Sequence, residues 1–163
     1  MLKNAYFAGG CFWCITPVFR LYDGVKSVTS GYSGGGEDNP SYEDVKHQKT
    51  GHRETIWVVY DSEVDFDTLM RIYLANVDPF DGEGQFIDKG FSYTLAVFYT
   101  DEGQKAAAEA RIRDLEQSSG RKACIALEAF RSFWPAEEYH QDYDLKNPEA
   151  FQKELEESGR LKH

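Results

Sequence analysis

Short apolar segments rich in β-branched and aromatic residues predict five strands along the chain. Each is bounded by polar residues or glycines, as strands in a folded sheet usually are. The last segment has the weakest pattern. The predicted strands are Ala5–Ala8, Val25–Thr29, Glu54–Tyr60, Tyr93–Tyr99 and Ala123–Leu127. Gly31–Gly36, rich in glycine, is interpreted as a loop within the same domain.

Apolar residues spaced three and four apart predict helices between these strands. In Asp65–Asn76 the apolar side chains share one face and Asp65 can cap the start, while Asp101–Gln117 is rich in alanine. A further helix is expected to begin at about Cys11, after two glycines that end the first strand. The order β, α, β, β, α, β predicts an α+β fold. We expect a ferredoxin-like two-layer sandwich with a mixed sheet and additional irregular aromatic segments.

Length and charge narrow the possible functions. The chain has 163 residues, which suits a single domain over 1–163, and its net charge of −10 disfavours nucleic acid and anionic membranes as partners. No apolar run reaches the ~18 residues of a membrane span, and the N-terminus lacks an export signal. Three cysteines are too few for a secreted disulfide scaffold. We therefore expect a cytoplasmic monomer.

Cys11 and Cys14 form the first candidate site. A cysteine at a helix N-terminus has a lowered pKa, because the helix dipole and free backbone N–H groups stabilise the thiolate. Cys14 lies one turn further on and could close a short disulfide with Cys11. Both could also be buried apolar residues or half of a zinc site. Zinc needs four ligands, however, and no second pair is found among Cys124, His47, His52 and His140.

Phe12 and Trp13 lie between the two cysteines, where general thiol–disulfide oxidoreductases of the thioredoxin type hold small residues or proline. Two aromatic rings beside a reactive thiol, on a turn that should expose them, suit a shallow site for a methyl or thioether group. Aromatic residues are more often part of a core. These two side chains therefore do not identify the site by themselves.

A series of motifs in order from Cys11 to about Pro148 resembles the A-type peptide-methionine sulfoxide reductase family. Each motif is weak alone, but together and at this spacing they are specific. They are Gly10-Cys11-Phe12-Trp13, Gly31-Tyr32-Ser33-Gly34-Gly35, Pro40-Ser41-Tyr42-Glu43-Asp44-Val45, Thr50-Gly51-His52-Arg53-Glu54, Asp78-Pro79, Gly84-Gln85-Phe86-Ile87-Asp88-Lys89-Gly90, Tyr93 and Pro135-Ala136-Glu137-Glu138-Tyr139-His140-Gln141.

The resemblance implies reduction of the S epimer of methionine sulfoxide, free or in oxidised proteins, with thioredoxin as electron donor and without cofactor or metal. Cys11 would attack the sulfoxide sulfur, and Glu54 would be the acid that protonates its oxygen, with a pKa raised by burial. The hydroxyls of Tyr42 and Tyr93 would bind that oxygen. Asp88 would lie near the substrate backbone and Cys11.

The same resemblance implies that Cys11 is left as a sulfenic acid, which a second thiol converts to a disulfide. Cys14 is the nearest candidate. Many family members instead carry the resolving cysteine in a glycine-rich C-terminal tail, whereas residues 147–163 here are charged, helical in pattern and free of cysteine. Pro17 could distort the helix that carries Cys14. Cys124, in a predicted strand, is expected to be a buried inert thiol, but the sequence leaves open whether Cys14 or Cys124 resolves the sulfenic acid.

Two histidines are given structural interpretations. His52 is expected to hold the loop that carries Glu54, and His140 has no chemical task that the sequence reveals. Two other functional classes stay open. A general thiol–disulfide oxidoreductase would need only Cys11 and Cys14, and a non-catalytic module could bind oxidised or Met-rich peptides through its aromatic surface.

Overall fold

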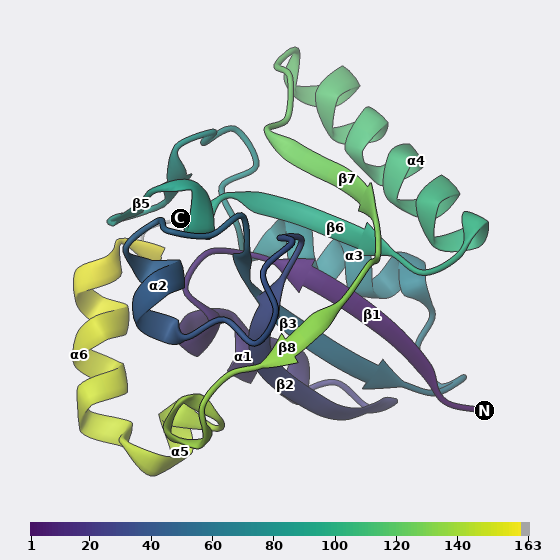
Figure 1. Ribbon diagram of the computed structural model, residues 1–163. Helices are drawn as coiled ribbons and strands as arrows, with labels where there is room; N and C mark the ends of the chain where they lie inside the picture. The colour runs from purple at the N-terminus through teal and green to yellow at the C-terminus, as the bar shows by residue number, and fades with distance from the viewer. Residues whose placement is uncertain (161–163) are drawn as a thin grey trace.

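A six-stranded mixed sheet forms the centre of the computed structural model, which describes residues 1–160 (Figure 1). The strand order is β7-β6-β1-β3-β2-β8. Only β6 and β7 run parallel; the other neighbouring strands are antiparallel. The strands are β1 (Lys3–Ala8), β2 (Val25–Ser33), β3 (Arg53–Tyr60), β6 (Leu95–Tyr99), β7 (Ile125–Ala129) and β8 (Phe133–Pro135).

The ferredoxin-like arrangement predicted from the sequence is confirmed in the four central strands. They follow the order β6-β1-β3-β2, and α1 (Phe12–Arg20) and α3 (Phe66–Ala75) supply the two helical connections. Two strands extend this unit. The helix α4 (Glu102–Ser119) connects β6 to the parallel strand β7, and β8 adds to β2 at the opposite edge.

Polar caps fix the starts of the two helices whose periodicity was clearest in the sequence. Asp65 accepts a hydrogen bond of 2.8 Å from the backbone N–H of Thr68 at the start of α3. Asp101 accepts one of 2.8 Å from Gln104 at the start of α4. Each cap satisfies a backbone donor that the first helical turn leaves free. Both helices therefore begin where the sequence predicts.

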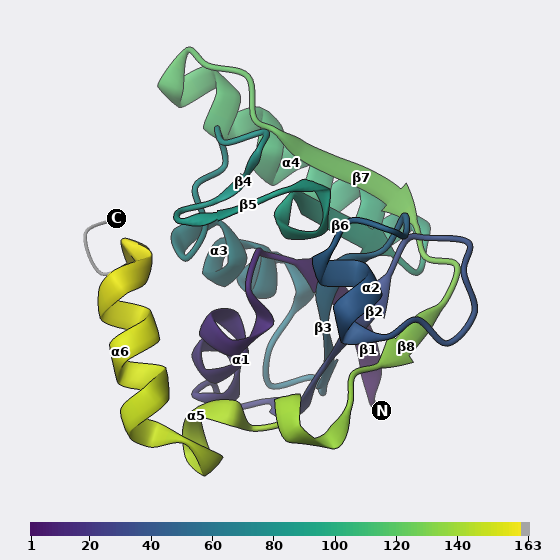
Figure 2. The ribbon, with the colours of Figure 1, turned by 60° about the vertical axis from the view of Figure 1, so that its left-hand side comes forward.

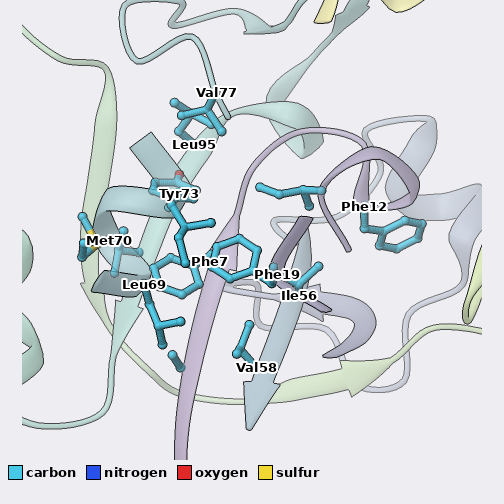
Figure 3. Packing of buried hydrophobic residues seen from close by; sticks show 14 of the residues in the cluster. Phe7, Phe12, Phe19, Ile56, Val58, Leu69, Met70, Tyr73, Val77 and Leu95 are labelled. Atoms are coloured by element: carbon cyan, nitrogen blue, oxygen red, sulfur yellow. The ribbon is translucent and has the colours of Figure 1, made fainter. Parts of the chain in front are cut away.

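Helices α1 and α3 cover one face of the sheet and build the main core there (Figure 3). The Phe7 ring of β1 packs between Phe19 of α1, at a centroid distance of 5.4 Å, and Tyr73 of α3, at 5.0 Å. The Tyr73 hydroxyl donates a hydrogen bond of 2.6 Å to the carbonyl of Ala8. The core thereby fixes the end of β1, where the chain turns into α1.

The other face of the sheet carries a smaller aromatic cluster. Tyr6 of β1 stacks on Phe130 at 4.0 Å and lies 6.3 Å from Trp57 of β3. Alternate residues of one strand therefore enter two different cores, as the two-residue period of a strand requires.

Short elements surround the end of the sheet at which α1 begins (Figure 2). Within residues 1–160, no helix has the length and apolar character needed to cross a membrane. The remaining elements are α2 (Tyr42–Lys46), the hairpin of β4 (Gly84–Gln85) and β5 (Asp88–Lys89), 3-10 turns at Phe91–Tyr93 and Glu138–His140, α5 (Tyr143–Lys146) and α6 (Pro148–Ser158). The helical pattern seen in residues 147–163 is confirmed as far as Ser158, and residues 161–163 lie outside the described part.

Three local predictions were wrong, each because of tertiary contacts. β2 continues to Ser33 through the predicted loop, because it pairs with β3 on one side and β8 on the other. Tyr93 belongs to a 3-10 turn, and its strand begins only at Leu95. Cys124 precedes β7 and is exposed, because its thiol lies against the carbonyl of Phe80 and not in the core. Helix α1 continues through Pro17 to Arg20.

Candidate active site

A tight turn after β1 places Cys11 immediately before the first residue of α1. Gly10 has a φ of +86°, and a Cβ atom there would lie 2.7 Å from Cβ of Gln85. Both the backbone conformation and the close approach of Gln85 therefore require glycine. Cys11 follows as the N-cap residue of α1, with its side chain buried.

The antiparallel pairing of β1 with β3 brings Glu54 to the same turn. Phe7 lies opposite Ile56, so the end of β1 meets the start of β3. Glu54 points to the helix side of the sheet, and its Oε1 accepts a hydrogen bond of 3.1 Å from the backbone N–H of Phe12. The first free N–H of α1 is thus satisfied by a carboxyl from a distant strand.

Glu54 is only 1% exposed, and this burial raises its pKa to about 8. The negative charges of Asp88 and Cys14 raise the pKa further, whereas the hydrogen bond from Phe12 lowers it. A carboxyl in this setting holds its proton at neutral pH. Its second oxygen, Oε2, is buried and has no hydrogen-bond partner. The site therefore contains a protonated acid with one oxygen left for a ligand.

Cys11 and Cys14 are hydrogen-bonded to each other, and both are buried. The bond to Cys14, burial and the nearby carboxyls of Glu54 and Asp88 raise the pKa of Cys11 above that of a free thiol. The same bond and the guanidinium of Arg160 lower the pKa of Cys14. The predicted lowering of the Cys11 pKa is therefore not found in the free site. Instead, the Cys11 thiol keeps its proton and donates its hydrogen bond to Cys14, whose pKa is the lowered one.

Tyr42 is the first residue of α2, and Tyr93 is the last residue of the 3-10 turn Phe91–Tyr93. Burial raises the pKa of both phenols, and the charge of Glu54 raises it further. The electrostatic influence of Cys11 also reaches both rings, which places them close to its sulfur. Both hydroxyls keep their protons at neutral pH and can donate hydrogen bonds to an oxygen in the site.

Glu137 and Tyr32 also build the site, although the sequence assigned no role to either. The Tyr32 hydroxyl donates a hydrogen bond of 2.8 Å to Oε1 of Glu137, and the backbone N–H of Tyr42 donates one of 3.0 Å to Oε2. One carboxylate thus connects β2 to α2. Both residues belong to motifs that resemble those of the reductase family. This membership was the one feature of the sequence that could have indicated a role for them.

An aromatic wall flanks Cys11. Phe12 is 1% exposed and packs against Tyr42 and His140. The sequence predicted that the rings of Phe12 and Trp13 are exposed, and for Phe12 this prediction was wrong. Trp13 is half-buried and stacks on Tyr143 at 3.9 Å. The C-terminal segment covers the rings through His140 and Tyr143. Such a contact between distant parts of the chain could not be predicted from the local sequence of the turn.

His140 and His52 have contacts that suit structural roles. The indole N–H of Trp13 donates a hydrogen bond of 2.9 Å to Nδ1 of His140, and burial lowers the pKa of His140 to about 4, so the ring is neutral. His52 is buried, and its Nδ1 accepts a hydrogen bond of 3.2 Å from the N–H of Gly35. His140 therefore orients Trp13.

Asp88 lies on the β4–β5 hairpin and is half-buried. Burial and the charge of Glu154 raise its pKa, while Arg160 lowers it. Its charge reaches Cys11, Cys14 and Glu54, so the structure brings it to the site. Among residues 1–160, no cluster of three or more His, Cys, Asp or Glu side chains could hold a metal ion, so the zinc alternative has no ligand set there.

Comparison with known proteins shows the family of the chain. The family model of peptide methionine sulfoxide reductase matches residues 3–162. The Staphylococcus aureus (strain Mu50) peptide methionine sulfoxide reductase MsrA 2 is 48% identical over 161 residues, which cover 97% of this chain and 91% of that protein. The chain thus belongs to the peptide methionine sulfoxide reductase family.

Solved structures share the fold. The reduced form of Mxr1 from Saccharomyces cerevisiae is 29% identical, with a TM-score of 0.84 over 91% of this chain and 87% of that one. Mxr1 in complex with Trx2 is 22% identical, with a TM-score of 0.58 over 87% and 84%. The chain is accordingly an oxidoreductase of the A type that acts on methionine sulfoxide. A non-catalytic binding module is excluded.

Proposed function

We propose that this enzyme reduces the S epimer of methionine sulfoxide, free or within oxidised proteins, through Cys11 and Glu54. The observation that carries the proposal is the buried, protonated Glu54 beside Cys11, whose Oε2 has no partner. A sulfoxide oxygen is a poor leaving group until a proton reaches it. A thiol and an acid at the same turn supply the two groups that this reaction needs.

The reaction would need Cys14 in its ionised form, and it would begin with transfer of the Cys11 proton to the Cys14 thiolate, its hydrogen-bond partner. The Cys11 thiolate then attacks the sulfoxide sulfur while Glu54 protonates the oxygen. Tyr42 and Tyr93 donate hydrogen bonds to that oxygen as its negative charge grows. The hydroxyl then bonds to the Cys11 sulfur as its bond to the substrate sulfur and the new sulfur–sulfur bond break. Cys11 is left as a sulfenic acid, and methionine leaves with the electron pair of the broken sulfur–sulfur bond.

Phe12, Trp13 and Asp88 would bind the substrate. The two aromatic rings present an apolar surface to the methyl and thioether groups, and Asp88 would lie near the substrate's backbone. Neutral His140 supports this surface by orienting the indole of Trp13. No cofactor enters these steps.

Cys14 would resolve the sulfenic acid. Cys14 loses the proton that it took from Cys11, its sulfur bonds to the Cys11 sulfur, and the sulfur–oxygen bond breaks. The hydroxyl leaves with that proton as water. Thioredoxin would then reduce the disulfide. The support for this partner is that a solved structure holds the related yeast Mxr1 in complex with Trx2. We also propose that residues 1–163 act as one catalytic domain, in a cytoplasmic monomer that repairs oxidised proteins.

Single-turnover reduction of the separate S and R epimers of a methionine sulfoxide peptide, by pre-reduced enzyme without added thiol, tests the proposal. We expect only the S epimer to react. Cys11→Ser should be inactive, Cys14→Ser should stop at the sulfenic acid, and Cys124→Ser, which alters an exposed cysteine, is the matched control with full activity. Equal reduction of both epimers would contradict the proposal, as would a Cys14→Ser variant that still forms an intramolecular disulfide.

A general thiol–disulfide oxidoreductase would depend on the two cysteines alone. Glu54→Gln separates this alternative from the proposal, because exchange between thiols and disulfides needs no acid at Glu54. Loss of sulfoxide reduction with retained disulfide exchange supports the proposal. Equal retention of both activities would favour the alternative.

A further inference from the structure

A hollow of about 360 Å³ opens beside α1. It lies between α1, the end of α3 and α6, which runs beside α1 in Figure 2. Its wall is mostly apolar and includes Cys14. The lining residues are Cys14, Pro17, Val18, Leu21, Ala75, Asn76, Phe151, Leu155 and Arg160.

The two sulfurs of the pair face different surroundings. Cys11 immediately precedes Phe12, whose N–H donates a hydrogen bond to Glu54, and the charge of Cys11 raises the pKa of Tyr42 and Tyr93. Cys14 lines the hollow and is influenced by Arg160 and Glu154 at the C-terminal end of the chain. One end of a disulfide between them would therefore face the sulfoxide site, and the other end would face the hollow.

Arg160 gives the hollow a positive charge next to the sulfur. Its guanidinium donates hydrogen bonds to the carbonyls of Gly9, at 2.8 Å, and Asn76, at 3.0 Å, and its plane lies over the Phe86 ring. These contacts hold the cation beside the turn that carries Cys11 and Cys14. A fixed guanidinium favours an incoming thiolate and the thiolates that thiol–disulfide exchange releases.

We propose that this hollow is the docking site for the thiol-bearing loop of a dithiol protein reductant, which attacks the Cys11–Cys14 disulfide at Sγ of Cys14. The inference rests on the disulfide proposed above. Attack in thiol–disulfide exchange occurs at one chosen sulfur through a mixed disulfide, and access decides which sulfur reacts. The charge of Arg160 and the apolar wall match a thiolate carried on an apolar loop.

The electrons balance over two exchanges. The reductant thiolate bonds to Sγ of Cys14, the bond between Cys14 and Cys11 breaks, and Cys11 leaves as a thiolate with its electron pair. The second thiol of the reductant loses its proton and attacks the mixed disulfide, which releases the Cys14 thiolate. The two protons of the dithiol return to the enzyme pair. Cys11 is thus freed for the next sulfoxide before the reductant leaves.

Trapping the mixed disulfide tests the site of attack. The full-length Cys124→Ser enzyme is oxidised with one equivalent of methionine sulfoxide, and peptide mapping without reductant first establishes whether the Cys11–Cys14 disulfide has formed. It is then mixed with a thioredoxin whose second active-site cysteine is serine. We expect the adduct on Cys14. An adduct on Cys11, or none, overturns this inference alone, whereas absence of the disulfide overturns the proposed recycling and this inference with it.

Filling the hollow tests the docking site. Ala75, at the end of α3, is exposed and lines the hollow, whereas Ala106 is exposed on α4 and is not among the lining residues. Ala75→Trp should lower kcat/KM for thioredoxin at least about ten-fold more than it lowers the rate of single-turnover sulfoxide reduction. Ala106→Trp, the matched control, should show no such change. Equal effects of the two substitutions would overturn the docking site.

Discussion

At the scale of single residues, Glu54 shows how the site obtains an acid that works at neutral pH. Its carboxyl is buried on the helix side of the sheet and receives one backbone hydrogen bond from Phe12. Burial disfavours its charged form more than this bond favours it, and the pKa therefore rises to about 8. The same burial has opposite consequences for catalysis and for stability.

The rate of sulfoxide reduction should depend on Glu54 and on pH. The acid form is needed, so the single-turnover rate should fall about ten-fold per pH unit once the pH exceeds about 8. Glu54→Gln should lower the rate about 10²- to 10³-fold and remove this decline. Stopped assays of peptide sulfoxide between pH 6 and about 9.5 measure both effects.

Glu43→Gln is the matched control, because Glu43 is an exposed carboxyl on α2 next to Tyr42. It should retain both the rate and the decline above pH 8. If the decline persists unchanged in Glu54→Gln, another group causes it and Glu54 is not the acid.

Stability should change in the opposite direction. Because the folded pKa of Glu54 is raised from 4.5 to about 8, the unfolded chain releases this proton at a lower pH than the folded protein does. The protein therefore loses stability as pH rises from about 4.5 to about 8, by at most about 3 kcal/mol at pH 7. Glu54→Gln removes the loss, so its Tm at pH 7 should exceed that of the parent by several degrees.

Thermal unfolding followed by circular dichroism at pH 4 and pH 7 measures this difference. The gain should vanish at pH 4, where Glu54 is protonated in both the folded and the unfolded chain. A variant that is less stable than the parent at pH 7 would contradict the linkage. Glu43→Gln should show no such pH-dependent gain.

At the scale of elements, the turn between β1 and α1 determines where both thiols lie. The turn is fixed from three sides: Tyr73 binds the Ala8 carbonyl, Arg160 binds the Gly9 carbonyl, and Gln85 packs against Gly10. These contacts come from α3, from the segment that follows α6 and from the β4–β5 hairpin. The first turn of α1 therefore has little freedom to move relative to Glu54.

Gly10→Ala should disrupt this turn. Alanine is strained at a φ of +86°, and its methyl group would lie 2.7 Å from Cβ of Gln85. We expect a loss of about 2 to 3 kcal/mol in the free energy of unfolding, measured by urea denaturation, together with slower sulfoxide reduction. Gly36→Ala is the control, since a Cβ atom there has nothing within 4 Å. A Gly10→Ala variant as stable as Gly36→Ala would show that the turn can relax.

At the scale of the whole molecule, one sheet carries both cores and the site at one of its ends. The main core lies under α1 and α3, and the smaller aromatic cluster lies on the opposite face. Strand β1 contributes Phe7 to one core and Tyr6 to the other. Loss of either core would therefore disturb the central strands on which the other depends.

The chain should accordingly unfold as a single unit. Its three tryptophans report on different regions: Trp13 at the site, Trp57 on the opposite face and Trp134 on the edge strand β8. Denaturation curves from tryptophan fluorescence and from far-ultraviolet circular dichroism should coincide. Two separate transitions would contradict the single-domain proposal. Measuring the reduced protein excludes a disulfide as the cause of any difference.

Local features of the sequence determined much of the fold. The caps Asp65 and Asp101, the helical periodicity of α3 and α4 and the order of the elements depend on residues a few positions apart, and all agree with the structure. The motifs also identified Cys11, Glu54, Tyr42, Tyr93 and Asp88 as candidates, and the structure brings these residues to one end of the sheet.

Only the tertiary structure decided the electrostatic state of the site. Glu54 and Phe12 are 42 positions apart, and they meet because β1 and β3 are antiparallel neighbours. Burial and neighbouring charges set the pKa of a group, and both depend on such long-range pairing. For this reason the raised pKa of Cys11 could not be predicted from the sequence. It could not show that Cys14 faces a hollow, because that wall comes from α1, α3 and α6 together.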